Sequence, residues 1–308
     1  MKYVNLFINY WKRGYALKRA INNHNIDIIY TFLFDASIVG IVAKIFTGVK
    51  QVSSVRFGSN HYYKRPITIK KIIEYLLYIM IYNSSNKIIA NSVSGKLTLI
   101  KDMKITSKKI VVIHNGKPLF NKKNPTQSYI KKHSNEEIII GFVGRLNKIK
   151  NPHMAIDAVS YLTTYYNINL IILGNEDGIT IKELEDYAKD NKVKLQCLGN
   201  VNDLEHYYNI FDVLISSSTS IEGCSNVILE ALSVGLPVVA SDVGDNKLLL
   251  ANKRGLIVAS NDFNLFAKSL EYYIKNEDKM QGKRIQYIKN NFSVKKMIDK
   301  TRSILIQI

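Results

Sequence analysis

The chain has 308 residues, of which 46% are hydrophobic, so it is long enough to form two domains with buried cores. It contains no run of about eighteen or more apolar residues, which argues against a membrane-spanning helix. Its net charge of +18 comes from the first half of the chain. Residues 1–134 hold 23 Lys and Arg against 4 Asp and Glu, whereas residues 135–308 hold 20 against 21.

The basic half of the chain narrows the choice of partners. A strongly basic surface binds nucleic acid, an anionic membrane or an anionic substrate. The sequence has no helix-turn-helix, zinc-finger spacing or RNA-recognition motif, so we expect no nucleic-acid partner and favour an anionic membrane surface. The two cysteines, Cys197 and Cys224, do not form a disulfide framework, and the start is unlike a secretory signal, which together indicate the cytoplasm.

Helices and strands alternate through the first half. We expect helices at 10–23, 36–46 and 66–82, a further helix that begins at 92–95, and strands at 26–31, 50–55, 87–91 and 109–114. Gly48 marks the end of the second helix, since glycine is common just past a helix C-terminus. Strands that alternate with helices predict a parallel sheet with crossover connections.

The pattern breaks after Asn115-Gly116, where residues 117–136 are rich in Lys and Asn and predict a linker. The alternation then resumes, with strands expected at 137–143, 168–173, 193–198, 212–216, 237–241 and 255–258 and closing helices at about 263–275, 278–290 and 293–305. Six strands in this rhythm predict a Rossmann-like doubly wound sheet. We therefore expect an α/β protein with an N-terminal domain at 1–116, a linker at 117–136, a C-terminal domain at 137–290 and a closing helix at 291–308.

The helix expected at 66–82 has two interpretations. Its run of Ile and Leu is typical of a helix that packs in the core of the first domain. The other interpretation is a helix that lies in a membrane interface, with tyrosines at the boundary and four cations on the lipid headgroups: Lys64, Arg65, Lys70 and Lys71.

Two carboxylates stand out between Ser216 and Asp245, a stretch that reads as a strand end, a polar loop, a short helix, a Gly-Pro turn and a strand. Glu222 lies in the loop, and Glu230 lies in a helix that is apolar nearly all round. An acid in a buried helix needs a partner, unless Glu230 lies on a solvated edge. The helix start can be capped by Ser225 or Asn226, and its backbone N–H groups then form an anion site.

Two cations follow the first strand of the second half. Gly144-Arg145 ends that strand, and Lys150-Asn151-Pro152 opens the next helix. Ligands of open α/β sheets bind beyond the carboxyl ends of the strands, so both cations are placed to stabilise a diphosphate leaving group. The alternative is a solvated basic turn, which is common in a Lys-rich chain.

The sequence E-G-x-x-N-V-x-L-E-A-x-x-x-G-x-P-V-V-A-x-D-V-G at 222–244 resembles the signature of glycosyltransferase family 4, the retaining nucleotide-sugar transferases with the GT-B fold. The resemblance implies that Glu222 contacts the donor sugar and Glu230 the ribose of the nucleotide, with Arg145 and Lys150 completing the catalytic group. It also implies further donor-binding positions at Gly144, Gly174, Asn200, Gly223, Cys224, Ser225 and Asn226.

Other segments follow the order of the same family, so the resemblance covers nearly the whole chain. They are ANS at 90–92, IHNG at 113–116, GFVGRLNKIKN at 141–151 and ILGN at 172–175. One departure is that the family begins with a strand, a Gly-rich loop, a helix and a second strand, which this sequence does not contain. We therefore expect a GT-B-like pair of Rossmann-like domains whose N-terminal member is incomplete by about 40–60 residues. The resemblance also implies that the last helix crosses back to the first domain.

We expect no metal and no cofactor. His61, His114 and His133 lack the spacing of metal ligands, and no Asp-x-Asp stands at a strand end to hold Mg²⁺. The resemblance implies that protein cations and a helix N-terminus take the place of the metal. On the acceptor side we expect Arg56, Asn60 and His61, in the polar loop after the strand at 50–55.

These features predict a retaining hexosyltransferase of bacterial surface-polysaccharide assembly, such as that of lipopolysaccharide or capsule. It would take a hexose from a nucleoside-diphosphate sugar and pass it to a lipid-linked or growing saccharide, as a cytoplasmic protein at the inner face of the cell membrane. One alternative is a catalytically inactive remnant of the same fold that binds a membrane or a partner through its basic domain. Another is a sugar-nucleotide epimerase of similar fold, which the E-x7-E loop disfavours.

Overall fold

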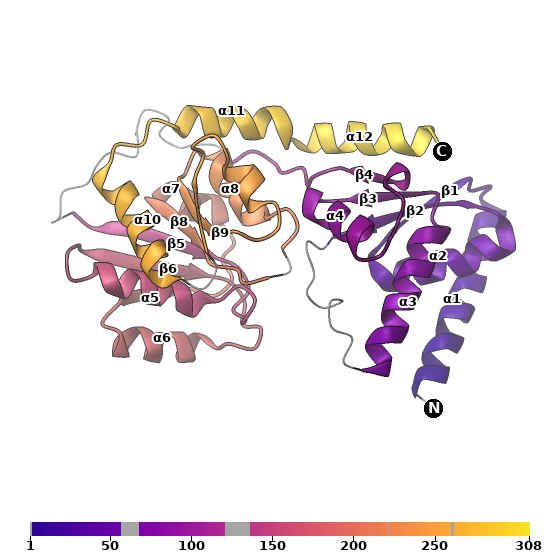
Figure 1. Ribbon diagram of the computed structural model, residues 1–308, viewed down its shortest axis with the longest axis horizontal. Coiled ribbons are helices and arrows are strands. Elements are labelled where there is room, and N and C mark those ends of the chain that lie inside the picture. The colour runs from indigo at the N-terminus through magenta and orange to yellow at the C-terminus, as the bar shows by residue number, and fades with distance from the viewer. Residues whose placement is uncertain (1, 57–67, 121–135, 221, 260–261) are drawn as a thin grey trace. The chain divides into compact units, whose positions relative to one another are not determined.

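The computed structural model describes residues 2–56, 68–120, 136–220, 222–259 and 262–308 (Figure 1). The chain divides into two compact units. Unit 1 consists of residues 1–115 and 297–308, and unit 2 consists of residues 116–296. Each unit is built on one parallel β-sheet, so the expected α/β class with two parallel-sheet domains is confirmed.

Unit 1 holds a four-stranded sheet in the order β1-β2-β3-β4. Its strands are β1 (Ile28–Phe32), β2 (Lys50–Val55), β3 (Lys87–Ala90) and β4 (Ile110–Val112). Its helices are α1 (Lys2–Asn23), α2 (Leu33–Thr47), α3 (Ile69–Ser84), α4 (Val93–Lys101), the short η1 (Ser107–Lys109) and most of α12 (Val294–Ile306).

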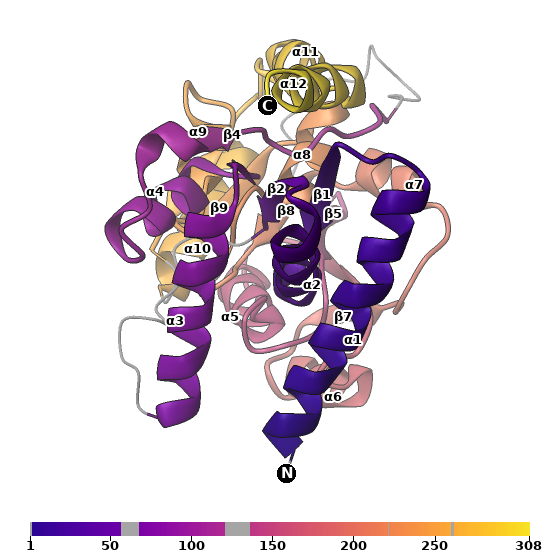
Figure 2. The same cartoon turned by 90° about the vertical axis from the view of Figure 1, so that its right-hand side faces the viewer.

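The two faces of the unit 1 sheet are covered by different helices. Each crossover steps to the next strand in one direction, and because such crossovers are right-handed, α2, α3 and α4 lie on the same face. Figure 2 shows α1 and α3 on either side of α2. Ile88 and Ala90 of β3 pack into that layer, whereas Ile89 between them packs with Met297 and Leu305 of α12 on the other face.

Unit 2 holds a six-stranded sheet in the order β10-β9-β8-β5-β6-β7. Its strands are β5 (Ile138–Val143), β6 (Ile168–Leu173), β7 (Lys194–Cys197), β8 (Val213–Ser216), β9 (Val238–Ser241) and β10 (Leu256–Val258). Its helices are α5 (Pro152–Leu162), α6 (Ile181–Asp190), α7 (Leu204–Ile210), α8 (Asn226–Ser233), α9 (Asn246–Leu250), α10 (Phe263–Lys275) and α11 (Gln281–Asn291).

Unit 2 is wound in both directions from its centre. The chain runs from β5 outward to β7, returns to β8 beside β5, and continues outward to β10 on the other side. The crossovers from β5 to β7 run in one direction along the sheet, and those from β8 to β10 run in the other. Because both sets are right-handed, their helices lie on opposite faces of the sheet. Phe142 of β5 accordingly packs with Ile156 of α5 and Phe266 of α10, while Leu214 of β8 packs with Ile228 of α8 and other residues of the second face.

The boundaries of most elements lie close to the expected ones, and β2 has the expected bounds. The largest difference is α1, which begins at Lys2 rather than Tyr10 because no glycine or proline interrupts the preceding residues. The helix α3 begins at Ile69, where the hydroxyl of Thr68 accepts the backbone N–H of Lys71 at 3.4 Å, and the expected start at Pro66 lies outside the described residues. Within the described ranges, no helix is long and apolar enough to cross a membrane.

Candidate active site

The edge of the unit 2 sheet where β5 and β8 end is a point at which the strand order reverses. After β5 the chain turns toward β6 on one side, and after β8 it turns toward β9 on the other. The loops that follow the two strands therefore diverge, and open α/β sheets bind ligands in the crevice left between them. Gly144 follows β5 and Ser217 follows β8, so the residues after these two define the candidate site.

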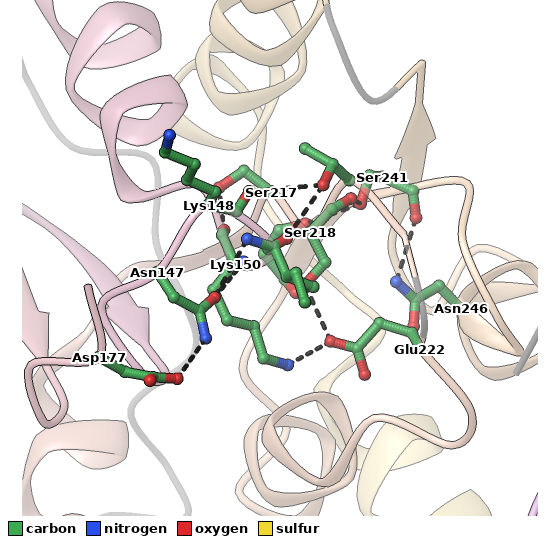
Figure 3. A network of polar contacts seen from close by, with 12 residues as sticks. Asn147, Lys148, Lys150, Asp177, Ser217, Ser218, Glu222, Ser241 and Asn246 are labelled. Carbon is green, nitrogen blue, oxygen red and sulfur yellow. Dashed lines mark hydrogen bonds and ion pairs between the residues drawn. The ribbon is translucent and has the colours of Figure 1, made fainter. Parts of the chain in front are cut away.

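Lys150 and Glu222 meet at this edge (Figure 3). The ammonium group of Lys150 forms an ion pair with Oε1 of Glu222, and the hydroxyl of Ser218 donates to the same oxygen at 2.9 Å. The two charged side chains are only 22% and 12% exposed. The cation expected to hold the diphosphate and the carboxylate expected to contact the sugar therefore lie within reach of one bound ligand.

The turn that carries Lys150 is fixed by Asn147. The side-chain oxygen of Asn147 accepts the backbone N–H groups of Ile149 at 3.1 Å and Lys150 at 2.9 Å. Its amide nitrogen donates to Asp177 at 2.7 Å (Figure 3). Asn151 then adopts a left-handed conformation, with φ of 51°, before Pro152 starts α5. One buried amide thus sets the backbone from which Lys150 extends.

Arg145 lies at the same strand end but in a separate pair. Its Nη1 donates to Oδ2 of Asp177 at 2.8 Å, the same oxygen that Asn147 contacts. The side chain of Arg145 is 66% exposed, so this ion pair contributes little to stability. The guanidinium can therefore exchange Asp177 for a phosphate at small cost, and its planar fork suits that ligand.

Gly174 follows β6 beside Gly144, and the backbone of the two strand ends is unusually close there. A Cβ atom on Gly174 would lie 1.8 Å from the carbonyl oxygen of Gly144, which only glycine avoids. The N–H of Gly174 donates to the oxygen of Gly199 at 2.7 Å. The expected donor-binding positions Gly144 and Gly174 thus adjoin one another, and Asn200 lies exposed just beyond them.

The loop that carries Glu222 rests on a second glycine. Gly244 has φ of +57°, and a Cβ atom there would lie 2.5 Å from the carbonyl oxygens of Glu222 and Gly223. The N–H of Asp245 also donates to the oxygen of Gly223 at 2.9 Å. The close contact at Gly244 and the hydrogen bond to Gly223 therefore fix the backbone of Glu222 beside Lys150.

Glu230 is a buried carboxylate with two protein partners. Its Oε1 lies 2.6 Å from the ammonium group of Lys117, and the hydroxyl of Tyr208 donates to Oε2 at 2.9 Å. Glu230 is 8% exposed, so the interpretation of a solvated helix edge is wrong. Complete burial and the adjacent carboxylate raise the pKa of Tyr208 well above its usual range, so Tyr208 stays a hydrogen-bond donor.

Two family models match the chain. The model described as "Glycosyl transferases group 1" matches residues 124–291, and the model described as "Glycosyltransferase Family 4" matches residues 4–118. The chain belongs to the glycosyl transferases group 1 family. The resemblance seen in the sequence is thereby confirmed, and this chain is a glycosyltransferase.

Two known proteins similar to this glycosyltransferase are named for action on lipid-linked saccharides. It is 27% identical to the Escherichia coli "UDP-Gal:alpha-D-GlcNAc-diphosphoundecaprenol alpha-1,3-galactosyltransferase", over 94% of this chain and 78% of the relative. It is 26% identical to the Campylobacter jejuni "GalNAc-alpha-(1->4)-GalNAc-alpha-(1->3)-diNAcBac-PP-undecaprenol alpha-1,4-N-acetyl-D-galactosaminyltransferase", over 87% of this chain and 70% of the relative.

A solved structure shares the fold of this glycosyltransferase. The Anabaena protein HepE, crystallised in complex with UDP, superposes with a TM-score of 0.80. The superposition covers 96% of this chain and 82% of that one, at 19% sequence identity. At this identity the likeness concerns the fold alone.

Three of the expected donor-binding residues link Glu222 to α8. Cys224 and Ser225 are buried, and Asn226 is the exposed first residue of the helix. Ser225, one of the two residues expected there, occupies the N-cap position, and its side chain makes no capping hydrogen bond within the described part of the chain.

Four residues of the site were not expected from the sequence: Lys117, Asp177, Tyr208 and Ser218. Lys117 lies at the start of the expected linker, and its neighbour Phe120 packs its ring 5.7 Å from that of Tyr208. The sequence signal was the buried acid itself, since Glu230 in an apolar helix requires a partner. Nothing in the local pattern identifies which residue supplies it, because the partners come from distant segments.

The expected acceptor-side residues are only partly described. Asn60 and His61 lie outside the described residues. Arg56 follows β2, and its guanidinium donates to Asn115 at 2.8 Å and to Ser54 at 3.3 Å. Among the residues that the structure places, no three His, Cys, Asp or Glu side chains gather in a way that could hold a metal.

Proposed function

We propose that this glycosyltransferase moves a hexose from a nucleoside-diphosphate sugar to a lipid-linked or growing surface saccharide, with retention of the anomeric configuration. The observation that supports this most strongly is the meeting of Lys150 and Glu222 at the reversal point of the unit 2 sheet. A diphosphate beside Lys150 places the sugar that it carries beside Glu222. The names of the Escherichia coli and Campylobacter jejuni relatives supply the class of acceptor.

The proposed reaction begins when the donor replaces internal ion pairs. Lys150 then pairs with the bound diphosphate in place of Glu222, and Arg145 pairs with it in place of Asp177. Both cations stabilise the negative charge that develops on the diphosphate as the sugar–oxygen bond breaks. Glu222, released from Lys150, then faces a sugar that gains positive charge. A hydroxyl of the acceptor attacks from the face that the diphosphate leaves and passes its proton to the departing diphosphate oxygen, so no protein nucleophile is required. In this proposal the protein supplies all of the positive charge, and neither a metal nor a cofactor takes part.

The test of this function is transfer with a defined stereochemical outcome. We would incubate the full chain with a panel of nucleotide sugars and a synthetic saccharide on a diphospho-polyprenol. One donor is expected to give a product in which the new bond keeps the donor configuration, read from the anomeric proton coupling by NMR. Inverted product, or sugar released to water with no transfer to any acceptor, would overturn the proposal. Lys150→Met should abolish transfer, whereas Lys148→Met, an exposed cation of the same turn, should not.

We also propose that unit 1 holds the protein at the inner face of an anionic membrane. The helix α3 presents apolar side chains to solvent at helical spacing, which forms one exposed stripe: Ile69, Ile72, Ile73, Leu76 and Met80. On α1, exposed Trp11 and Tyr15 pack edge-on against Phe46, and the ammonium of Lys18 lies 5.1 Å from the Tyr15 ring. Aromatic rings beside cations are typical of a membrane interface.

Flotation with vesicles tests the membrane proposal. Because residues 1–134 hold the basic excess, the chain should float with anionic vesicles, and salt should weaken the binding since exposed charges are screened beyond about 8–10 Å. Leu76→Ser should weaken it further, whereas Leu248→Ser, an exposed leucine of unit 2, should not. Equal flotation with neutral and anionic vesicles would contradict the electrostatic part.

A further inference from the structure

Unit 1 contains a cavity of about 300 Å³ that is lined by residues of this unit alone, and Arg56 of the expected acceptor side is one of them. It lies at the carboxyl ends of the strands, where Phe32 ends β1, Arg56 follows β2 and Asn91 follows β3. The helix α12 closes it with Ile298, Arg302 and neighbouring residues. Ligands of parallel sheets bind beyond this end of the strands, so the cavity is in the right place for a substrate.

One part of the cavity is strongly positive. Arg56 and Arg302 both line it, and no acidic side chain does so among the residues that the structure describes. Arg56 is held in place, because its guanidinium donates to Asn115 at 2.8 Å and lies 5.2 Å from the ring of Phe32. A fixed guanidinium keeps its fork ready for a phosphate, which it binds through two parallel hydrogen bonds.

A buried polar group points to a ligand at the same place. Asn91 is 7% exposed and lines the cavity, and its side-chain oxygen has no hydrogen-bond partner within the described part of the chain. A buried amide oxygen without a partner is costly, and a ligand hydroxyl or an ordered water would satisfy it. Turned over, the same amide presents two N–H donors, which suit a phosphate oxygen.

Much of the remaining lining is apolar, and Ser54, Asn115 and Thr301 are its further polar members. The rings of Tyr30 and Phe32 line it from β1, with centroids 4.4 Å apart and planes tilted by 51°, and Ile298 and Leu305 line it from α12. Ligand pockets typically range over about 300–1,000 Å³, so this one suits the end of a molecule rather than a whole lipid-linked saccharide. Positive charge beside an apolar wall matches a phosphate joined to a hydrocarbon chain.

We propose that this cavity binds the diphosphate and the first isoprenoid carbons of the acceptor lipid, with Arg56 and Arg302 on the phosphates and Tyr30 and Leu305 on the chain. The identity of the lipid rests on the proposed function, but the amphiphilic anion site does not. The cavity thus anchors the acceptor, and the saccharide beyond the diphosphate is left outside it.

Calorimetry with farnesyl diphosphate, below its micelle concentration, tests the site on the full chain. Arg56→Ala and Arg302→Ala should each weaken binding at least 10-fold, since each removes a charged hydrogen bond. Asn91→Asp, which places a negative charge in the cavity without changing its size, should weaken it as much. Lys101→Ala, an exposed cation of α4 away from the cavity, should leave it unchanged.

Three outcomes are decisive. If both arginine variants bind farnesyl diphosphate as tightly as the unchanged chain, the proposed anion site is wrong. It is also wrong if farnesol binds more tightly than farnesyl diphosphate. Pyrophosphate that binds as tightly as farnesyl diphosphate would overturn the lipid part and indicate a site for free phosphates. Binding of UDP, measured in parallel, should be the same in all four variants. A chain that binds farnesyl diphosphate but no nucleotide would contradict the proposed function and not the cavity.

Discussion

Glu222→Gln is expected to lower kcat by roughly 10²–10³-fold and to alter the donor KM much less. Glu222 lies in the loop before α8 and, without a ligand, is paired with Lys150 and Ser218. Its partner in the reaction is a sugar whose positive charge develops only as the bond breaks. An interaction that strengthens in the transition state affects turnover, whereas a uniform one affects apparent affinity. Steady-state kinetics of donor consumption measures both constants.

Glu230→Gln is the matched comparison, since it removes the other carboxylate of the E-x7-E pair. Glu230 is fixed within α8, and under the proposed function it holds a ribose diol, which does not change during the reaction. Loss of this carboxylate should weaken donor binding by about 1–3 kcal/mol. The donor KM should therefore rise, and kcat should change less. If Glu230→Gln lowers only the melting temperature and leaves the kinetics intact, Glu230 is a structural group that serves Lys117 and Tyr208 and not the nucleotide.

Lys117→Met is expected to destabilise the protein by about 3–5 kcal/mol, because it leaves the buried carboxylate of Glu230 without its cation. The ammonium and carboxylate are 2.6 Å apart, and the two side chains are 24% and 10% exposed. Tyr208 supplies a hydrogen bond to the carboxylate but no charge. Urea denaturation followed by circular dichroism measures the loss.

An exposed pair of the same length serves as the control. Lys194 lies 2.6 Å from Glu137, but these side chains are 57% and 39% exposed. Lys194→Met should therefore cost less than about 1 kcal/mol. The double variant Lys117→Met, Glu230→Gln should recover most of the lost stability, since no buried charge is left unpaired. Equal losses for Lys117→Met and Lys194→Met would contradict the assigned role of the buried pair.

The alternation of strand and helix patterns, together with glycines that follow helices, was enough to predict most helices and strands. Gly48 ends α2 with φ of 72°, and Gly235 ends α8 with φ of 79°, both as expected from a glycine at a helix end. Alternation predicted a doubly wound sheet, but it does not identify the two strands between which the strand order reverses. The reversal between β5 and β8, which locates the crevice, is therefore a finding of the structure.

The chemistry of the site was predictable where it follows strand ends, and not where it depends on distant partners. Lys150 and Glu222 were expected at the same edge of the sheet because each follows a strand, and they meet there. Lys117 and Asp177 were not expected. Each neutralises a charge that lies far away in the sequence, and the local sequence pattern around it does not indicate that partner. The apolar residues of α3 fit both a core helix and an interfacial helix in the sequence, and the exposure of one stripe of them is a finding of the structure. Contact of that stripe with a membrane stays a prediction.

Calorimetry of the full chain with UDP and with GDP, each in the presence of EDTA, is the most direct test of a donor site built from protein cations. One of the two nucleotides should bind without metal, because Lys150 and Arg145 supply the positive charge at the carboxyl end of β5. Lys150→Met and Arg145→Met should each weaken it about 10-fold or more, and Lys148→Met should not. Binding that requires Mg²⁺, or that survives both substitutions unchanged, would contradict the proposed donor site.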